Sequence, residues 1–402
     1  MARVLIGWEL GAHSGHVRRI LSIAEMLTRA GHAVSLALQR IDAGGAGTRG
    51  FPLFQAPIWP RLIASIAGTS TIRTHSEADI LARLGLDIPG TLSALIAGWD
   101  AIFAAARPDV VIAEYAPALL CAAAARIPSV GIGTAFELPP ATMPRFPSLA
   151  DKPAVTDEAA LLALTNGELA RAGRKPLAAL PAIFACDAPI VSAFAAFDPY
   201  AQWRETTLVP PQLPLPIPFA AEPRGPEAFV YWPENFAAAG KLWDALATSG
   251  LPIRLHAPSL LAAQSNRLAA AGLVIEPNPL PFAAIVARSR IIVSHGGAGI
   301  TSSALVAGLP HVVVPIDLEK SVQALGVTRL GAGGWSPPRS IVPERFGADL
   351  KALAHDPALA ARCRAEAERL RPLLGRDCAD HTLDAVERLL SADRATSNEP
   401  RP

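Results

Sequence analysis

The chain has 402 residues, of which 51% are hydrophobic and 18% are charged, so it is long and apolar enough for two domains. Its net charge of +1 gives no reason to expect binding to nucleic acid or to an anionic membrane. The 4 cysteines lack metal-ligand spacing, which favours reduced thiols in a cytoplasmic protein. We expect no signal peptide and no transmembrane segment. The abundance of Ala, Pro and Arg suggests a bacterial genome rich in GC.

The first half of the chain predicts a parallel α/β sheet. Apolar runs predict strands at 4–7, 33–38, 110–113 and 129–133, and apolar residues at helical spacing predict a helix over 18–30. Another helix is expected over 118–125. Strands that alternate with helices through short connections form parallel sheets with right-handed crossovers. Residues 190–192 and 208–209 are predicted as the last strands of this domain.

Repeated prolines mark a domain boundary at 210–227, because proline is excluded from helix and sheet interiors and favours a stiff, extended connection. A second alternation follows, with strands predicted at 228–232, 253–256, 274–275 and 291–294 and helices at 237–247 and 281–288. Residues 349–390 predict two long helices, and 391–402 a disordered tail.

The segment 291–315, IIVSHGGAGITSSALVAGLPHVVVP, combines a buried strand, a glycine-rich turn that opens with His295, a short helix and a second strand. A helix N-terminus offers unpaired N–H groups and a positive dipole end, and glycines allow phosphates to approach the backbone. The turn lacks the Lys-Ser/Thr pair of a P-loop and the glycine spacing of dinucleotide-binding folds. It therefore indicates a nucleotide held as a leaving group rather than hydrolysed.

This segment resembles the donor-binding signature of inverting, metal-independent nucleotide-sugar glycosyltransferases of the GT-B fold. The residues that carry the resemblance are HGGAG at 295–299, Ala304-Leu305, Gly308-Leu309-Pro310, Pro315 and Glu319. Residues 4–38 are similar to the family's first strand, histidine loop and first helix, and 108–133 to a middle segment. The resemblance implies two facing Rossmann-like domains with parallel sheets and an interdomain cleft.

The domain boundaries that follow from the resemblance divide the chain into five parts. Residues 1–209 would bind the acceptor, and 210–227 would form the proline-rich linker. Residues 228–375 would bind the nucleotide sugar, 376–390 would form a helix that returns to the first domain, and 391–402 would be the tail.

His16 is the leading candidate for a catalytic base. It follows Gly11 and Gly15 in a loop after the first strand, at the sheet edge where open α/β domains bind ligands. Imidazole has a pKa suited to accepting a proton from a hydroxyl near neutral pH. In the resembled family the base histidine falls on His16; the alternative is a helix-capping or loop histidine. His13 lies close by and is expected to shape the loop or touch the acceptor.

A carboxylate on the other ring nitrogen would fix the tautomer of a base histidine and stabilise its protonated form. The resemblance assigns this part to Glu114, at a position where aspartate is commoner. Asp109 is the rival, although a Pro-Asp pair before a strand is typical of a turn. If neither acid reaches His16, an acidic acceptor such as a phenol would need less help.

On the donor side, the resemblance implies that His295 donates to a diphosphate oxygen, with backbone N–H groups from Gly297 to Thr301 completing the cradle. Gly296, Gly299 and Ile300 belong to the same turn. No Asp-x-Asp motif is present, so no metal and no other cofactor is expected. Trp232 and Asn235 follow a strand and could contact the donor, or Trp232 could be a surface aromatic.

Several positions depart from the family pattern. Ile300 stands where Ser or Thr is frequent, so Thr301 or Ser302 would take over the phosphate contact. Ser303 replaces a ribose-binding glutamate of the plant enzymes. Glu319 keeps a carboxylate for sugar hydroxyls, whereas Lys320 replaces an amide, which suggests an unusual, acidic sugar or a side chain that points to solvent.

The sequence thus predicts a transferase that moves a sugar from a UDP- or dTDP-sugar to a hydroxyl of a small, lipophilic acceptor. Its partners would be these two substrates, with no nucleic acid. Two alternatives remain open: a nucleotide-sugar 2-epimerase, and a catalytically degraded auxiliary protein that activates a partner glycosyltransferase.

Overall fold

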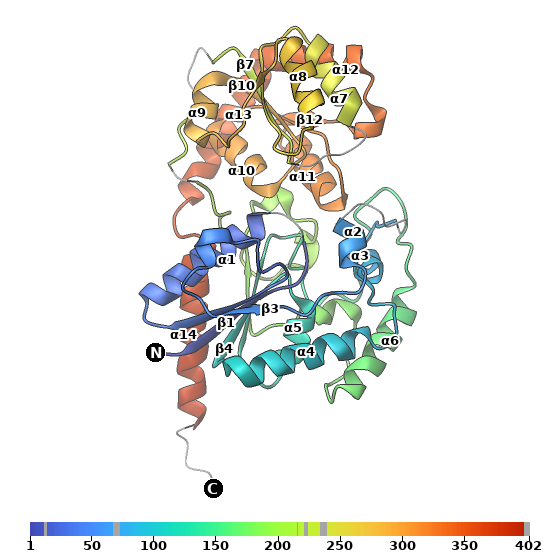
Figure 1. Ribbon diagram of the computed structural model, residues 1–402, viewed down its shortest axis with the longest axis vertical. Helices are drawn as coiled ribbons and strands as arrows, with labels where there is room; N and C mark the ends of the chain where they lie inside the picture. The colour runs from blue at the N-terminus through green and yellow to red at the C-terminus, as the bar shows by residue number, and fades with distance from the viewer. Residues whose placement is uncertain (12–13, 67–72, 215, 221–223, 234–238, 398–402) are drawn as a thin grey trace. The chain divides into compact units, whose positions relative to one another are not determined.

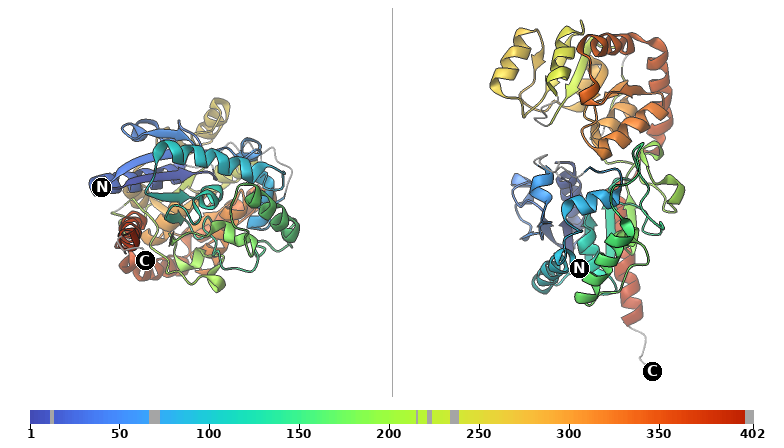
Figure 2. Two further views of the ribbon diagram at one scale, coloured as in Figure 1. Left: turned by 90° about the horizontal axis from the view of Figure 1, so that it is seen from below. Right: turned by 90° about the vertical axis from the view of Figure 1, so that its right-hand side faces the viewer.

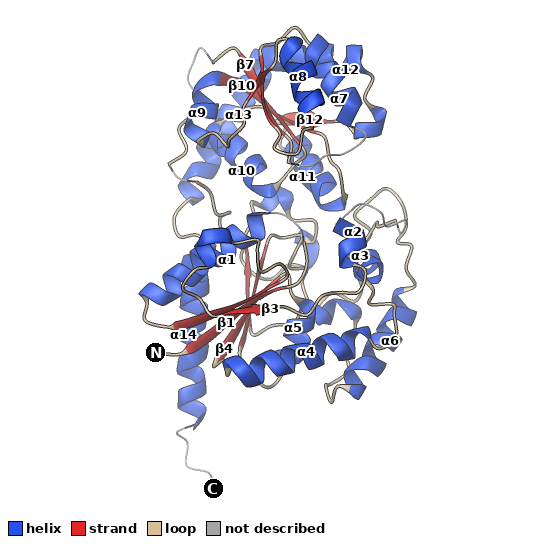
Figure 3. Ribbon diagram, in the orientation of Figure 1, coloured by secondary structure: helices blue, strands red, loops and turns tan. Residues whose placement is uncertain are grey.

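The structure, a computed structural model, describes residues 1–11, 14–66, 73–214, 216–220, 224–233 and 239–397 (Figure 1). It contains two compact units, Met1–Pro211 with Arg376–Pro402, and Gln212–Gly375. Each unit is built on a six-stranded parallel sheet flanked by helices (Figure 3). Strands of parallel sheets are buried on both faces, which is why they stand out in the sequence as continuous apolar runs. The α/β class predicted from the sequence is confirmed.

The sheet of the first unit has the strand order β3-β2-β1-β4-β5-β6. Its strands are β1 (Arg3–Trp8), β2 (Ala33–Leu38), β3 (Leu53–Gln55), β4 (Val110–Glu114), β5 (Ser129–Gly133) and β6 (Ala188–Val191). β1 and β4 are adjacent and parallel, and their last residues, Trp8 and Glu114, are in register. The segments that follow these two strands therefore leave the sheet at the same edge.

Helices from both ends of the chain cover one face of this sheet. α1 (Ser14–Arg29) packs against the C-terminal helix α14 (Cys378–Ser397), and both contribute to one apolar cluster with β1, β2, β4 and β5. Figure 2 shows α14, in red, running along the first unit. α4 (Thr91–Ala106) and α5 (Pro117–Ala123) belong to the cluster on the other face, and the unit also holds α2 (Leu62–Ile66), α3 (Glu77–Leu84) and α6 (Glu158–Arg171).

The sheet of the second unit has the order β12-β11-β10-β7-β8-β9. Its strands are β7 (Glu227–Tyr231), β8 (Ile253–His256), β9 (Val274–Ile275), β10 (Ser289–Ser294), β11 (His311–Val313) and β12 (Gly333–Trp335). Its helices are α7 (Gly240–Thr248), α8 (Ala262–Ala270), α9 (Phe282–Arg288), α10 (Ala298–Ala307), α11 (Leu318–Arg329), α12 (Pro343–His355) and α13 (Pro357–Leu370). The glycine-rich turn joins β10 to α10, as the sequence pattern predicts.

Several elements differ from the prediction. α1 begins at Ser14, so His16 lies in the first turn of the helix rather than in a loop. Residues 208–209 form no strand; Val209 makes an isolated bridge to Ser192. The region 349–390 belongs to three helices instead of two, because Asp356 caps α13 and a proline follows it. α14 extends to Ser397, so much of the expected tail is helical.

Two further expectations concern the whole chain. The cysteines at 121, 186, 363 and 378 are free thiols. Within the described residues, no helix combines the length and the hydropathy that a membrane crossing would need.

Substitutions of two neighbouring glycines in the edge strand β12 test how tightly the second sheet is packed. A Cβ added at Gly333 would lie 1.8 Å from the carbonyl oxygen of His311, whereas one added at Gly334 would meet its nearest neighbour at 4.0 Å. We therefore expect Gly333→Ala to lower the free energy of unfolding by about 1–3 kcal/mol, because backbone must shift to make room. Urea unfolding measures the change. Gly334→Ala is the matched control, and an equal loss from both substitutions would contradict the prediction.

Candidate functional site

The first unit joins His16 of α1 to Glu114 at the end of β4. His16 Nδ1 lies 3.0 Å from both carboxylate oxygens of Glu114. Both side chains are buried, with 6% of His16 and none of Glu114 exposed. A carboxylate can only accept here, so Nδ1 carries the hydrogen and Nε2 is left to take up a proton. In the resembled family aspartate is commoner at position 114, and here the longer side chain of glutamate also reaches the histidine.

The imidazole ring of His16 is held on two further sides. Trp8 at the end of β1 stacks on it, with ring centroids 5.4 Å apart and planes 20° apart. Gly11 lies at the edge that carries Nε2, where a Cβ would come within 2.1 Å of that nitrogen. Gly11 also has a φ of +83°, a conformation that strains other residues. A glycine is therefore required for the ring to occupy this place.

Two charged residues that the sequence analysis did not single out complete the cluster. Arg19, one turn after His16 on α1, contacts Glu114 and donates from Nη1 to Glu137 Oε2 at 2.8 Å. Glu137 Oε1 lies 3.7 Å from His16 Nδ1. The sequence held two signals that could have identified these residues. Arg19 is three residues after His16, so both lie on the same face of α1, and Glu137 follows β5 at the sheet edge where Glu114 ends β4.

Burial and charge act against each other in this cluster. Burial opposes protonation of His16, but attraction to Glu114 and Glu137 outweighs it and raises the pKa of the imidazole. Burial also opposes ionisation of Glu137, but Arg19, His16 and the Thr134 N–H lower its pKa to about 2. Glu137 is therefore ionised at neutral pH.

The cluster also has the composition of a metal site. Among the described residues, His16, Glu114 and Glu137 bring one ligand atom each to within 4.8 Å of one another. The guanidinium of Arg19 contacts both carboxylates, so a cation from the chain itself already pairs with each of them. We therefore interpret the cluster as an ion-pair network.

The segment before α1 is anchored by Glu9, which is completely buried. Its carboxylate accepts from the indole nitrogens of Trp59 at 3.0 Å and Trp99 at 2.6 Å. It also accepts from two backbone N–H groups in the first turn of α5, those of Ala118 and Leu119. Burial raises its pKa to about 7 despite these four hydrogen bonds. Glu9 thus fixes the chain just before the segment that leads to His16.

The second unit places His295 directly before the N-terminus of α10. The His295 side chain is 4% exposed and lies edge-on to Tyr231 and Trp232, at centroid distances of 5.7 and 6.4 Å. Gly297 is the N-cap of α10, and a Cβ there would lie 3.1 Å from His295 Nε2. The N–H groups of the first helical turn have no acceptor within the helix and point out of its end. This arrangement is an anion-binding geometry.

The cradle is shorter than predicted. The Thr301 N–H donates to Gly297 O at 3.0 Å as the first bond of the helix, so the N–H groups of the predicted cradle that remain for a ligand are those of residues 297–300. Thr301 and Ser302 are buried, with 0% and 3% of each residue exposed, and the phosphate contact expected of one of their hydroxyls stays a prediction. Gly299 is exposed and Ile300 is half-buried at this end.

A buried histidine supports the turn from behind. His311 Nε2 lies 2.8 Å from Ser294 Oγ, which accepts from the Gly296 N–H at 3.0 Å. Burial lowers the pKa of His311 to about 3, so the ring is neutral. Gly296 has a φ of +94°, and a Cβ there would lie 2.6 Å from Val313. The conformation of the turn is thus set by β11 as well as by its own glycines.

The other predicted donor residues fall into three groups. Lys320 does not point to solvent: its side chain is 3% exposed, and Nζ donates to Glu319 at 2.5 Å in the first turn of α11. Trp232 is completely buried against Trp243 and His295, so it supports the His295 ring and is not a surface aromatic. Asn235, and His13 in the first unit, lie outside the described residues.

The rival carboxylate for His16 is excluded by its partners. Asp109 pairs with Arg3, accepting from the Arg3 backbone N–H and guanidinium at 2.7 Å each. It lies at the start of β4, whereas Glu114 lies at the end. The two acids therefore belong to opposite edges of the sheet.

Comparisons with known proteins agree with this architecture. Residues 269–372 match the family described as erythromycin biosynthesis protein CIII-like, C-terminal domain. The structure is similar to that of CalG4, the calicheamicin glycosyltransferase, with a TM-score of 0.72 over 97% of this chain and 98% of that one at 20% identity. The chain has the GT-B fold. The resemblance proposed from the sequence is confirmed.

Two further proteins extend the comparison. The glycosyltransferase SsfS6 of Streptomyces sp. SF2575, complexed with thymidine diphosphate, has a TM-score of 0.62 and 20% identity over 96% of this chain and all of that one. The elloramycin glycosyltransferase ElmGT of Streptomyces olivaceus is 36% identical over 93 residues, which is 23% of each chain. The chain spans about a quarter of the length of the curated relatives that it matches.

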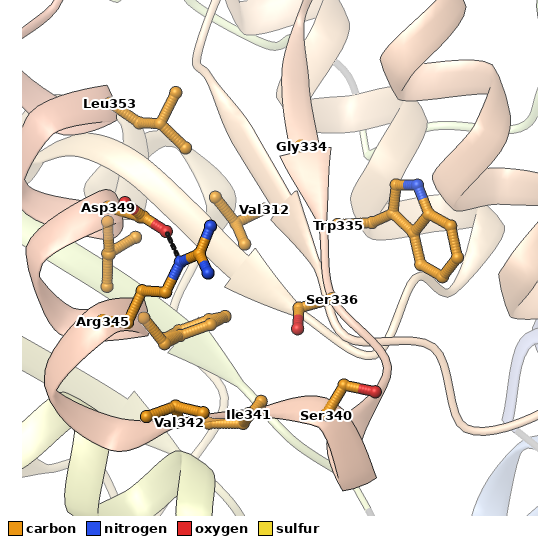
Figure 4. Close-up of a pocket in the computed structure, with 12 residues that line it drawn as sticks. Val312, Gly334, Trp335, Ser336, Ser340, Ile341, Val342, Arg345, Asp349 and Leu353 are labelled. Carbon is orange, nitrogen blue, oxygen red and sulfur yellow. Dashed lines mark ion pairs between the residues drawn. The ribbon is translucent and has the colours of Figure 1, made fainter.

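A cavity of about 330 Å³ lies elsewhere in the second unit, between β12 and α12 (Figure 4). Val312, Gly334 and Leu353 line it, Arg345 and Asp349 pair at 3.8 Å on its wall, and the indole of Trp335 points away from it. It includes none of the residues that the sequence singled out. We therefore place the chemistry at the sheet edges and not in this cavity.

The support of the glycine-rich turn can be tested through Ser294. His311 Nδ1 has no hydrogen-bond partner among the described residues, so Ser294→Ala would leave both ring nitrogens unpaired. We expect the free energy of unfolding to fall by about 1–3 kcal/mol, measured by urea unfolding. Ser321→Ala, which removes an exposed hydroxyl, is the control.

A double variant sharpens this test. Replacing both partners of a buried hydrogen bond by apolar groups costs less than stranding one of them. Ser294→Ala with His311→Leu should therefore lose less stability than the sum of the two single losses. Strict additivity would contradict the coupling.

Proposed function

We propose that the protein is an inverting glycosyltransferase that moves a sugar from a nucleoside diphosphate to a hydroxyl of a small, lipophilic acceptor. The observation that carries the proposal is the buried hydrogen bond between His16 and Glu114 at the strand ends of a GT-B fold. The names of CalG4, SsfS6 and ElmGT, each called a glycosyltransferase, support an enzyme of this class.

In the proposed reaction His16 is the general base. As the acceptor oxygen attacks the anomeric carbon of the donor sugar, its proton passes to His16 Nε2. Glu114 stabilises the imidazolium that forms and keeps Nδ1–H in place. The C1–O bond to the diphosphate breaks on the face opposite the attack, so the anomeric configuration inverts.

The second unit would hold the departing diphosphate. Negative charge grows on the diphosphate as the bond breaks, and fixed N–H donors stabilise it without reorganisation. The N–H groups of residues 297–300 would supply these donors, the positive end of the α10 dipole would add to their effect, and His295 lies beside them. These groups supply positive charge without a metal, so the proposal includes none.

Thymidine diphosphate in the SsfS6 complex supports a UDP- or dTDP-sugar as the donor. Glu319 is 20% exposed at the start of α11, pairs with Lys320, and would accept hydrogen bonds from sugar hydroxyls. Because Glu319 pairs with Lys320, the negative charge of its carboxylate is neutralised, and a sugar would meet a pair with no net charge. Since the ammonium group of Lys320 already pairs with Glu319, this arrangement argues against a dedicated site in which Lys320 binds the carboxylate of an acidic sugar.

The catalytic assignment is tested by His16→Ala. We expect the transfer rate to fall by about 10²–10⁴-fold, because the acceptor loses its base, while affinity for UDP and dTDP is unchanged. Mass spectrometry of reactions with a panel of nucleotide sugars and mixed alcohols and phenols measures transfer. His32→Ala, in the connection between α1 and β2, is the control. A variant that keeps most of its activity would refute the base assignment.

The donor assignment is tested by His295→Ala. We expect calorimetry to show affinity for the nucleoside diphosphate about tenfold weaker or worse, because a hydrogen bond to a charged oxygen is lost. His16→Ala serves as the reciprocal control. A wild-type chain that binds neither UDP nor dTDP would instead favour the auxiliary, non-catalytic alternative.

A further inference from the structure

His16 belongs to a buried group of four charged or ionisable side chains from three separate segments. His16 and Arg19 come from α1, Glu114 from the end of β4, and Glu137 from the segment after β5. Arg19 bridges the two carboxylates through one nitrogen, and His16 Nδ1 faces both of them, at 3.0 and 3.7 Å. The side chain of Arg19 is 12% exposed and the carboxylates 6% or less, so water screens these charges poorly.

Glu137 is fixed independently of the rest of the cluster. Its Oε2 accepts from the Thr134 N–H at 2.7 Å, and its own N–H donates to Thr134 Oγ1 at 3.3 Å. This reciprocal pair is the same arrangement that caps helices. Glu137 therefore presents an ionised carboxylate at a defined place whether or not His16 is charged.

Among the described residues, two further neighbours of His16 are uncharged. Trp8 of β1 stacks on the ring, and Gly11, which has no side chain, lies beside its Nε2 edge. From α14, Cys378 faces Arg19, and burial raises the pKa of this thiol to about 11, so it is neutral near pH 7. Two carboxylates and one guanidinium thus leave a net charge of −1 around a neutral imidazole, and none when the imidazole is protonated.

We propose that Arg19 and Glu137 are positioning residues that tune the proton affinity of His16 in opposite directions. Arg19 cancels one carboxylate, so that His16 can lose its proton near neutral pH and act as a base. Glu137 supplies the remaining negative charge, which stabilises the imidazolium after proton transfer. The catalytic consequence rests on the proposed function, whereas the effect on the titration of His16 does not.

The two substitutions have opposite expected signs. Without Arg19, His16 would face two uncompensated carboxylates and hold its proton to higher pH. Without the charge of Glu137, Arg19 would balance Glu114 alone, and His16 would lose its proton at lower pH. A residue that only supports the fold would not shift the titration in this paired way.

The test follows the His16 ring proton by NMR during a pH titration of Arg19→Met, Glu137→Gln and the wild-type chain, with EDTA present. The chain has 9 histidines, and the spectrum of His16→Gln identifies the resonance. We expect the midpoint to rise by about 1 pH unit or more in Arg19→Met and to fall by a similar amount in Glu137→Gln. Arg18→Met and Glu25→Gln remove exposed charges from the same helix and are the matched controls.

Activity supplies the second readout. The acid limb of the profile of kcat/KM against pH should move up in Arg19→Met and down in Glu137→Gln, in step with the NMR midpoints. Because NMR needs no activity, an inactive wild-type chain would refute the proposed function while leaving the tuning testable. Arg19→Lys keeps the charge and should return the midpoint toward the wild-type value.

Three outcomes would overturn the proposal in folded protein. These are midpoints that do not move, midpoints that move in the same direction in both variants, and controls that shift the midpoint as much as the buried substitutions do. If Arg19→Met fails to fold, Glu137→Gln decides alone: an unchanged or raised midpoint refutes the tuning.

Discussion

The buried hydrogen bond between His16 and Glu114 is the contact on which the functional interpretation depends. It forms because β1 and β4 are neighbours in a parallel sheet, so that α1 begins beside the last residue of β4. Burying an ionised carboxylate is costly unless it is paired. Pairing with Arg19 offsets this cost for Glu114. The hydrogen bond from His16 Nδ1 to Glu114 leaves Nε2 of the histidine as the site for proton uptake.

In the proposed reaction, the second unit would hold negative charge with neutral groups. Its glycine-rich turn aims the first N–H groups of α10 out of the helix end, and the turn is kept in shape by Ser294 and the neutral His311. A neutral support is required at this place, because a buried cation without a partner would be costly. The uncharged aromatic side chains of Tyr231 and Trp232 fix His295 by packing against its ring.

The family pattern and this chain differ at several positions, and the structure gives some of these differences a physical reason. Lys320, which replaces the amide residue of the family pattern, is buried against Glu319 instead of extending into solvent. The carboxylate of Glu319 therefore compensates the positive charge that this replacement introduces. Thr301 and Ser302 are buried, so the proposed phosphate contacts rest on the backbone of α10. The exchange of aspartate for Glu114 is accommodated because its carboxylate still reaches His16.

The sequence alone determined the alternation of strands and helices and the glycine-rich turn after β10, because apolar runs and parallel-sheet topology follow local rules. The pairing of His16 with Glu114 was expected only from the family resemblance, with Asp109 as the rival, and the structure decided between the two acids. Tertiary structure alone decided that α1 starts at Ser14, and that Arg19 and Glu137 join the histidine. Glu137 is 118 residues from Arg19, so their contact depends on how β5 and α1 pack and not on any local pattern. Charge balance in a buried cluster is a property of the folded chain, since its members meet only after the sheet has formed.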